Sequence, residues 1–234
     1  MNEKINQLTI LQYEKDVANY AMRVLGSKKE PSYKIEDNFE LENAVRYITS
    51  RAVLYETVIT AELLDLQEDQ ISYFVELDAR FKTAYRIKEK ILQKMQVDQM
   101  SMIEAINSIC DALRYTIVID DRLYKDKMEE YIRKIEDMGN QVIKFKNAWG
   151  NEYYQGLNVS FIDHDGFKFE VQFHTPNSYS IKEGKLRDVY NIIRDPDSSP
   201  DLIKKCNEIR RYYQKQVKVP EGMIGYHYEK GKKK

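Results

Sequence analysis

The sequence predicts an α+β fold, in which a mixed β-sheet is flanked by helices and preceded by a helical segment. Long amphipathic stretches fill residues 1 to about 78, and short alternating runs separated by turn signals follow them. We therefore expect a helical segment at 1–78, a sheet-containing core at 79–195, and a closing helix with a tail at 196–234.

The helical segment is predicted from apolar residues at helical spacing. "LTILQYEKDVANYAMRVLG" (8–26) carries such a stripe and ends at a glycine, which commonly follows the last turn of a helix. The stretch 27–38 is expected to be a loop. "FELENAVRYITSRAVLYETVITAELLDL" (39–66) is then long and strongly amphipathic, so its tyrosines are expected to pack against the core.

The core is predicted to contain strands and helices in alternation. "RYTIVID" (114–120) and "QVIKFKN" (141–147) are predicted strands on either side of a helix at 124–140. "YYQGLNVSFID" (153–163) and "FKFEVQFHT" (167–175) should form a hairpin, because Asp-Gly between alternating runs is a strong turn signal. Helices are expected at 180–195 and 201–216, followed by an irregular tail.

Composition limits the classes of function. The chain of 234 residues carries a formal net charge of −1, so no global basic field favours non-specific nucleic-acid binding. The N-terminus is too polar for a signal peptide, and no window resembles a membrane span, so we expect a cytoplasmic protein without membrane contact. Cys110 and Cys206 match no metal or redox spacing, which favours a reducing compartment.

The alternating strand at 167–175 has one apolar and one polar face. Glu170, Gln172 and His174 lie on the polar side, which either meets water or lines a site. The same parity places Arg114, Tyr154 and Asn158 on that surface, with Asp111 just before the first strand. Carboxylates that converge with basic groups suit phosphoryl-type chemistry, because magnesium takes one or two carboxylates and cations offset phosphate charge.

Four short motifs in this region resemble those of the RelA/SpoT-type nucleotide pyrophosphokinases, the (p)ppGpp synthetases. "FEVQFHTP" (169–176) is similar to their Glu-x-Gln-x-(Arg/His)-Thr strand, and "RFKTAYRIKEK" (80–90) to their Arg-x-Lys-(Ser/Thr) segment. "CDALRYTIVI" (110–119) resembles the strand with the metal-binding aspartate, and "YYQGLN" (153–158) the tyrosine segment. The residues of these motifs most resemble those of a branch of phage-associated and secreted toxin relatives.

The resemblance implies a nucleotidyltransferase-like synthetase fold and a role for each matching residue. Asp111 and Glu170 would be catalytic and hold Mg²⁺, and ATP would be bound by Arg80, Lys82, Lys90 and Arg114. The acceptor would be bound by Tyr154, Asn158, Gln172, His174, Lys144 and Lys146. The reaction would move pyrophosphate from ATP to the 3′-hydroxyl of a purine nucleotide. Its toxin relatives also imply an inhibitory, antitoxin-type partner and delivery as an effector.

Departures from the family pattern leave the acceptor open. Asn158 stands in place of a histidine, His174 in place of the more common arginine, and Arg86 in place of a serine. Guanine nucleotides, adenine nucleotides and the 3′ end of tRNA therefore remain alternatives. The tRNA alternative expects a basic surface made by Lys204, Lys205, Arg210, Arg211 and Lys215. A third alternative is a catalytically silent, phage-associated interaction module.

Overall fold

The computed structural model describes residues 7–21, 39–195 and 197–229, which form two compact units. The larger unit comprises Ile35–Asn147, Gly156–Thr175 and Pro220–Lys234, and the smaller one Met1–Lys34, Ala148–Gln155 and Pro176–Val219.

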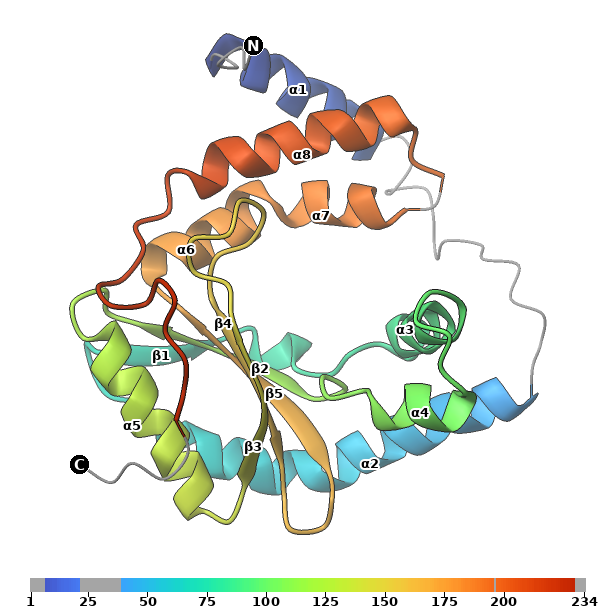
Figure 1. Cartoon of the computed structure of the whole chain (residues 1–234), viewed down its shortest axis with the longest axis vertical. Helices are drawn as coiled ribbons and strands as arrows, with labels where there is room; N and C mark the ends of the chain where they lie inside the picture. Colours follow the sequence, from blue (N-terminus) through green and yellow to red (C-terminus); the bar gives the residue numbers. More distant parts are fainter. Residues whose placement is uncertain (1–6, 22–38, 196, 230–234) are drawn as a thin grey trace. The chain divides into compact units, whose positions relative to one another are not determined.

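The larger unit contains a mixed sheet of five strands in the order β1-β2-β5-β4-β3 (Figure 1). Only β2 and β5 run parallel, and the other neighbours are antiparallel. The strands are β1 (Ser72–Val75), β2 (Arg114–Ile119), β3 (Gln141–Asn147), β4 (Leu157–Ile162) and β5 (Lys168–His174). This arrangement confirms the predicted α+β class.

The helices of this unit begin at capping residues or bury a periodic face. Thr83 caps α3 (Ala84–Gln96), and a Ser101–Glu104 capping box starts α4 (Met102–Asn107). In α5 (Tyr124–Asp137) the fully buried side chains recur at three- and four-residue intervals, as expected for a helix on a sheet. The long α2 (Phe39–Leu64) contacts α3 and α4.

The smaller unit is helical. It consists of α1 (Gln7–Tyr20), α6 (Pro176–Ser180), a π-helical turn (Ile181–Lys185), α7 (Arg187–Arg194) and α8 (Pro200–Gln214). Figure 1 shows α8 beside both α1 and α7. Tyr213 donates to Glu14 at 2.6 Å and Lys205 pairs with Asp16 at 2.9 Å, so polar contacts fasten α1 to α8.

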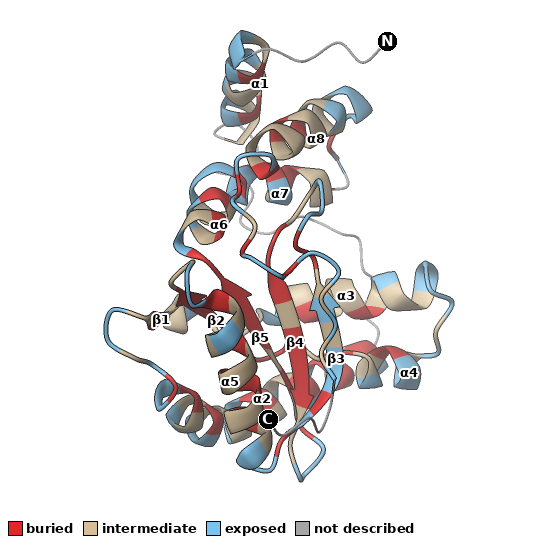
Figure 2. Cartoon of the chain, turned by 60° about the vertical axis from the view of Figure 1, so that its left-hand side comes forward, coloured by how far each residue is buried: buried red, intermediate tan, exposed pale blue. Residues whose placement is uncertain are grey.

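The sheet has the two faces that alternation predicted. On one face, fully buried apolar side chains of the three central strands are direct cross-strand partners. Val171 and Phe173 of β5 lie between Tyr115 and Ile117 of β2 on one side and Val159 and Leu157 of β4 on the other. Figure 2 shows β2, β5 and β4 largely in the buried colour and more of β3 exposed. The opposite face carries the polar side chains.

Three local predictions differ from the structure. A short strand, β1, lies inside the stretch 1–78 that was expected to be helical. The first hairpin strand begins at Leu157 rather than at residue 153, and the helix expected at 180–195 is interrupted by the π-helical turn. The predicted segment bounds at 78 and 195 stay a prediction. The expected loop 27–38 and the last residues of the tail lie outside the described residues.

No helix in the described part of the chain is long and apolar enough to cross a membrane. The described tail, residues 220–229, returns to the edge strand of the sheet. Met223 is fully buried, and the Asn147 side chain donates to the Met223 carbonyl at 2.7 Å. Tyr228 stacks on Phe145, with ring centroids 5.8 Å apart. The tail therefore completes the packing of β3.

Candidate active site

The polar face of the sheet collects side chains from four strands in two cross-strand rows. β5 pairs parallel with β2 and antiparallel with β4, and β4 pairs antiparallel with β3. In the observed register these side chains lie directly opposite one another on neighbouring strands. The first row is Arg114, Glu170, Ser160 and Lys144, and the second is Thr116, Gln172, Asn158 and Lys146. The predicted shared surface of Arg114, Asn158, Glu170 and Gln172 therefore exists.

The Asp111 carboxylate lies just before β2 and is held by two lysines. The Lys82 ammonium contacts Oδ2 at 2.6 Å, and the Lys90 ammonium contacts Oδ1 at 2.8 Å. Burial by itself would raise the pKa of Asp111, but the two ammonium groups, Lys82 foremost, lower it to about 2. Burial also lowers the pKa of Lys82, although the neighbouring carboxylate opposes that shift.

Backbone pairing brings these side chains together. The Lys82 amide donates to the Ala112 carbonyl at 2.9 Å, and the Arg114 amide donates to the Arg80 carbonyl at 2.8 Å. Residues 80–82 therefore run antiparallel beside 112–114. Lys90 reaches the same carboxylate from α3, which starts directly after this stretch. The Arg-x-Lys segment and the aspartate are thus structurally adjacent, as the motif resemblance implied.

Glu170 lies beside the beginning of β2. Its amide donates to the Leu113 carbonyl at 3.0 Å, and its Cα is paired with that of Arg114. The Gln172 side chain donates to Glu170 Oε1 at 2.8 Å, so the two predicted site residues orient each other. Glu170 is half-buried.

Arg80 is held by a contact that the sequence did not indicate. Its Nε donates to Glu56 of α2 at 2.7 Å, its Nη1 donates to the Leu77 carbonyl, and its guanidinium lies over the Phe81 ring. Glu56 also accepts from Thr60, whose hydroxyl lies 2.6 Å from that of Tyr115 on β2. No sequence pattern marks Glu56, because its partner lies in a different element of the fold.

The other predicted acceptor residues are placed less uniformly. His174 is on the polar face but fully buried, whereas Lys144 and Lys146 are exposed on β3. Tyr154 precedes β4 and belongs to the smaller unit, where the Asn151 side chain accepts from its backbone amide at 3.3 Å. The parity argument that placed Tyr154 on the polar face is therefore wrong, because no strand passes through it. Its stacking role stays a prediction.

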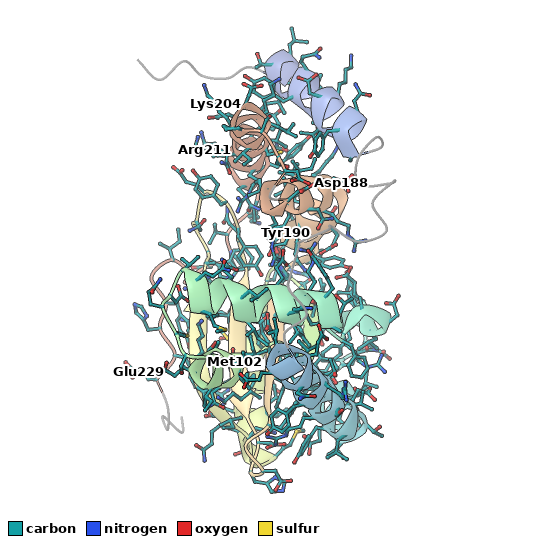
Figure 3. The ribbon with its side chains drawn as sticks, turned by 90° about the vertical axis from the view of Figure 1, so that its right-hand side faces the viewer. Met102, Asp188, Tyr190, Lys204, Arg211 and Glu229 are labelled. Carbon is teal, nitrogen blue, oxygen red and sulfur yellow. The ribbon has the colours of Figure 1, made fainter. Side chains whose placement is uncertain are left out.

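The basic residues of α8 are mostly engaged within the smaller unit. Lys205 pairs with Asp16, and Arg211 pairs with Glu208 at 2.8 Å. Arg210 lies over the Tyr153 ring, 4.9 Å from its centroid. Lys204 and Arg211 are labelled on this helix in Figure 3. These contacts reduce the free positive charge that the tRNA alternative requires.

Carboxylate oxygens such as those of Asp111 and Glu170 suit magnesium better than a transition metal. Among the described residues, no group of three or more His, Cys, Asp and Glu side chains gathers as a metal cluster. Magnesium needs no such cluster, since it is commonly held by one or two carboxylates together with water and substrate phosphates. Asp111 and Glu170 flank the beginning of β2 and supply that number.

Comparisons with known proteins returned solved structures alone. No family model and no curated protein matches the chain. A GTP pyrophosphokinase family protein from Streptococcus pneumoniae is 15% identical, with a TM-score of 0.44 over 78% of this chain and 89% of that one. Small alarmone synthetase 2 from Bacillus subtilis is 14% identical, with a TM-score of 0.44 over 75% and 94%.

A further similar structure is the complex between the Type VI effector Tas1 and its immunity protein. It is 15% identical to this chain, with a TM-score of 0.39 over 76% of this chain and 96% of that one.

Proposed function

We propose that the chain is an ATP-dependent pyrophosphokinase that transfers the β,γ-pyrophosphate of ATP to the 3′-hydroxyl of a purine nucleotide. The acceptor oxygen forms a bond to the β-phosphorus, the bond between that phosphorus and the α,β-bridging oxygen breaks, and AMP leaves. The hydroxyl proton must be removed, and the charge on the leaving AMP must be stabilised.

One observation carries this proposal: two lysines and a carboxylate converge at the beginning of β2, beside Arg114 and Glu170. Lys82 and Lys90 contact Asp111 directly, and Glu170 follows on the neighbouring strand in register with Arg114. Phosphoryl-type transfer requires mainly alignment and charge neutralisation, which this concentration of cations and carboxylates can provide.

The residues take complementary roles. Lys82, Lys90 and Arg114 bind phosphate oxygens, since both lysines contact Asp111 and Arg114 lies near enough to lower the pKa of Lys82. Glu170 accepts the proton of the acceptor hydroxyl, and Gln172 fixes the carboxylate orientation through its 2.8 Å hydrogen bond. Asp111 and Glu170 would hold Mg²⁺, which when bound neutralises phosphate charge and favours deprotonation of the acceptor.

The acceptor surface follows the second row of the sheet. Asn158 and Lys146 are cross-strand partners there, and Lys144 continues the first row, so amide and ammonium groups extend from Glu170 towards the sheet edge. Such groups suit the ribose and phosphates of a nucleotide. We therefore favour a free purine nucleotide over tRNA, because Lys205 and Arg211 of the basic surface that tRNA would need on α8 are already ion-paired.

A toxin role belongs to the same proposal. Unrestrained transfer would consume ATP and let the product accumulate, which would harm the cell that makes the protein. We therefore expect an inhibitory partner. This role is tested separately, by expressing the wild type and Glu170→Gln under tight control and following growth. Growth arrest by both proteins would show that toxicity does not depend on the transfer.

The deciding experiment follows AMP release from ATP with magnesium while GDP, GTP, ADP, AMP and bulk tRNA are offered separately. Glu170→Gln should lose at least a hundredfold in turnover, because the acceptor proton loses its base. Glu221→Gln is the matched control, since Glu221 is exposed. Acceptor-dependent AMP release that survives Glu170→Gln would refute the assigned base. Absence of AMP release with every acceptor would favour the silent module.

A further inference from the structure

We propose that Lys82 and Lys90 are exchangeable counter-ions of Asp111, which release its carboxylate to a divalent cation only when the phosphates of ATP replace the carboxylate as their partner. The divalent cation then enters the site together with the nucleotide and not before it. This inference rests on the proposed function and adds an order of binding to it.

Both carboxylate oxygens of Asp111 are already occupied. One ammonium contacts each oxygen, at 2.6 Å for Lys82 and 2.8 Å for Lys90. The Asp111 side chain is only 12% exposed, so water offers it few alternative partners. Because each oxygen already carries an ammonium group in a mostly buried position, we expect a cation that binds this carboxylate to displace at least one of the two lysines.

Displacement without nucleotide is unfavourable on electrostatic grounds. A buried ammonium that loses its carboxylate becomes an uncompensated charge, which is costly in a poorly hydrated position. Lys82, Lys90 and Arg114 would also face the incoming dication, because they lie near enough to influence one another. The two negative charges of Asp111 and Glu170 cannot neutralise the three side-chain cations together with a dication.

The phosphates of ATP reverse this balance. They bring several negative charges, and each lysine can turn its ammonium from the carboxylate to a phosphate oxygen on its flexible four-carbon side chain. Lys90 is 28% exposed and Lys82 14%, so Lys90 has more freedom for this movement. The freed oxygens of Asp111 are then available to the cation that accompanies the phosphates.

The alternative is that the lysines are fixed structural partners of Asp111. Replacing them would then lower stability without creating any affinity for cations. The exchange predicts that replacing a lysine raises the affinity for a divalent cation, because the removed ammonium leaves an oxygen of Asp111 open. Binding of a metal alone therefore separates the two explanations, and it needs no turnover.

The test measures Mn²⁺ binding by electron paramagnetic resonance, without nucleotide. We expect weak binding to the wild type and at least tenfold tighter binding to Lys90→Met and to the Lys82→Met/Lys90→Met double variant. Lys94→Met is the matched control, because Lys94 lies on the same helix but pairs with Asp98. Adding Asp111→Asn to the double variant should abolish the gain. Thermal unfolding confirms that each variant is folded.

A second measurement covers the case in which the double variant does not fold. The unreactive analogue α,β-methylene-ATP should bind the wild type in the presence of EDTA, and Lys90→Met should bind it at least fivefold more weakly. Wild-type binding of Mn²⁺ alone as tight as that of folded Lys90→Met would overturn the exchange. Metal-free binding of the analogue that is unaffected by Lys90→Met would do so as well.

The outcomes distinguish this inference from the proposed function. If AMP is formed but Mn²⁺ binding is unchanged by Lys90→Met, the exchange is wrong and the pyrophosphokinase stands. If Lys90→Met gains Mn²⁺ affinity but no acceptor yields AMP, the exchange of counter-ions stands and the assigned reaction fails.

Discussion

Replacement of Asp111 by asparagine should destabilise the fold in a pH-dependent manner. The pKa of this carboxyl is about 2, against 3.8 for an ordinary aspartate, because two ammonium groups favour its charged form. At about 1.4 kcal/mol per unit, the difference corresponds to roughly 2 kcal/mol of stability at pH 7. Asparagine cannot supply this term, so the free energy of unfolding should fall by at least that amount.

The sign of the pH effect follows from the depressed pKa. Stabilisation by the folded-state carboxylate is fully present above the pKa of the unfolded chain, near 4, and is lost as the pH falls towards 2. The stability difference between wild type and Asp111→Asn should therefore shrink to about half by pH 3. Other carboxyl groups titrate equally in both proteins and cancel in the difference.

The assay is urea unfolding of both proteins at pH 7, 4 and 3, read by circular dichroism and fluorescence. Asp98→Asn is a suitable control, since Asp98 forms an exposed ion pair with Lys94 and should change stability little. A stability difference between wild type and Asp111→Asn that stays constant from pH 7 to 3 would refute the ion-paired carboxylate. So would an equal effect of Asp98→Asn.

Three further predictions test other parts of the structure. Thr60→Val should cost about 1–3 kcal/mol because it leaves the buried Tyr115 hydroxyl without its 2.6 Å partner, and the double variant with Tyr115→Phe should recover part of that loss in urea unfolding. Met223→Ala should lower the free energy of unfolding by about 2–5 kcal/mol in the same assay, because this side chain is fully buried. A decrease below about 0.5 kcal/mol would show that the tail is not packed. Gln172→Met should lower turnover about tenfold with little change in stability, because Glu170 loses its orienting donor; an unchanged rate of AMP release would refute this role.

Local patterns predicted the centre of the sheet well. β5 alternates strictly after an Asp-Gly turn, and both features are encoded within a few residues. The register of Arg114 with Glu170 then follows from the way the strands associate, which residue spacing cannot specify. The motif resemblance bridged that gap for Asp111, since it linked segments that are distant in the sequence.

Features that depend on non-local contacts were missed. β1 has four residues, which is too short for a periodic signal in the sequence. Within the sheet it pairs with β2 only. Tyr154 looked like part of an alternating strand, but the Asn151 side chain holds the backbone in a turn there. The Glu56–Arg80 ion pair joins α2 to the segment before α3, and a glutamate on a helix gives no indication of such a partner.

The parallel pairing of β2 with β5 also has a consequence for how the protein is made. The whole of α5, β3 and β4 lies between these two strands in the sequence, so their contact closes the longest loop of the sheet and is expected late in folding. A chain still emerging from the ribosome already contains Lys82, Lys90 and Asp111, but not Glu170. The two carboxylates meet only after β5 has been synthesised, so nascent chains should be inactive until then.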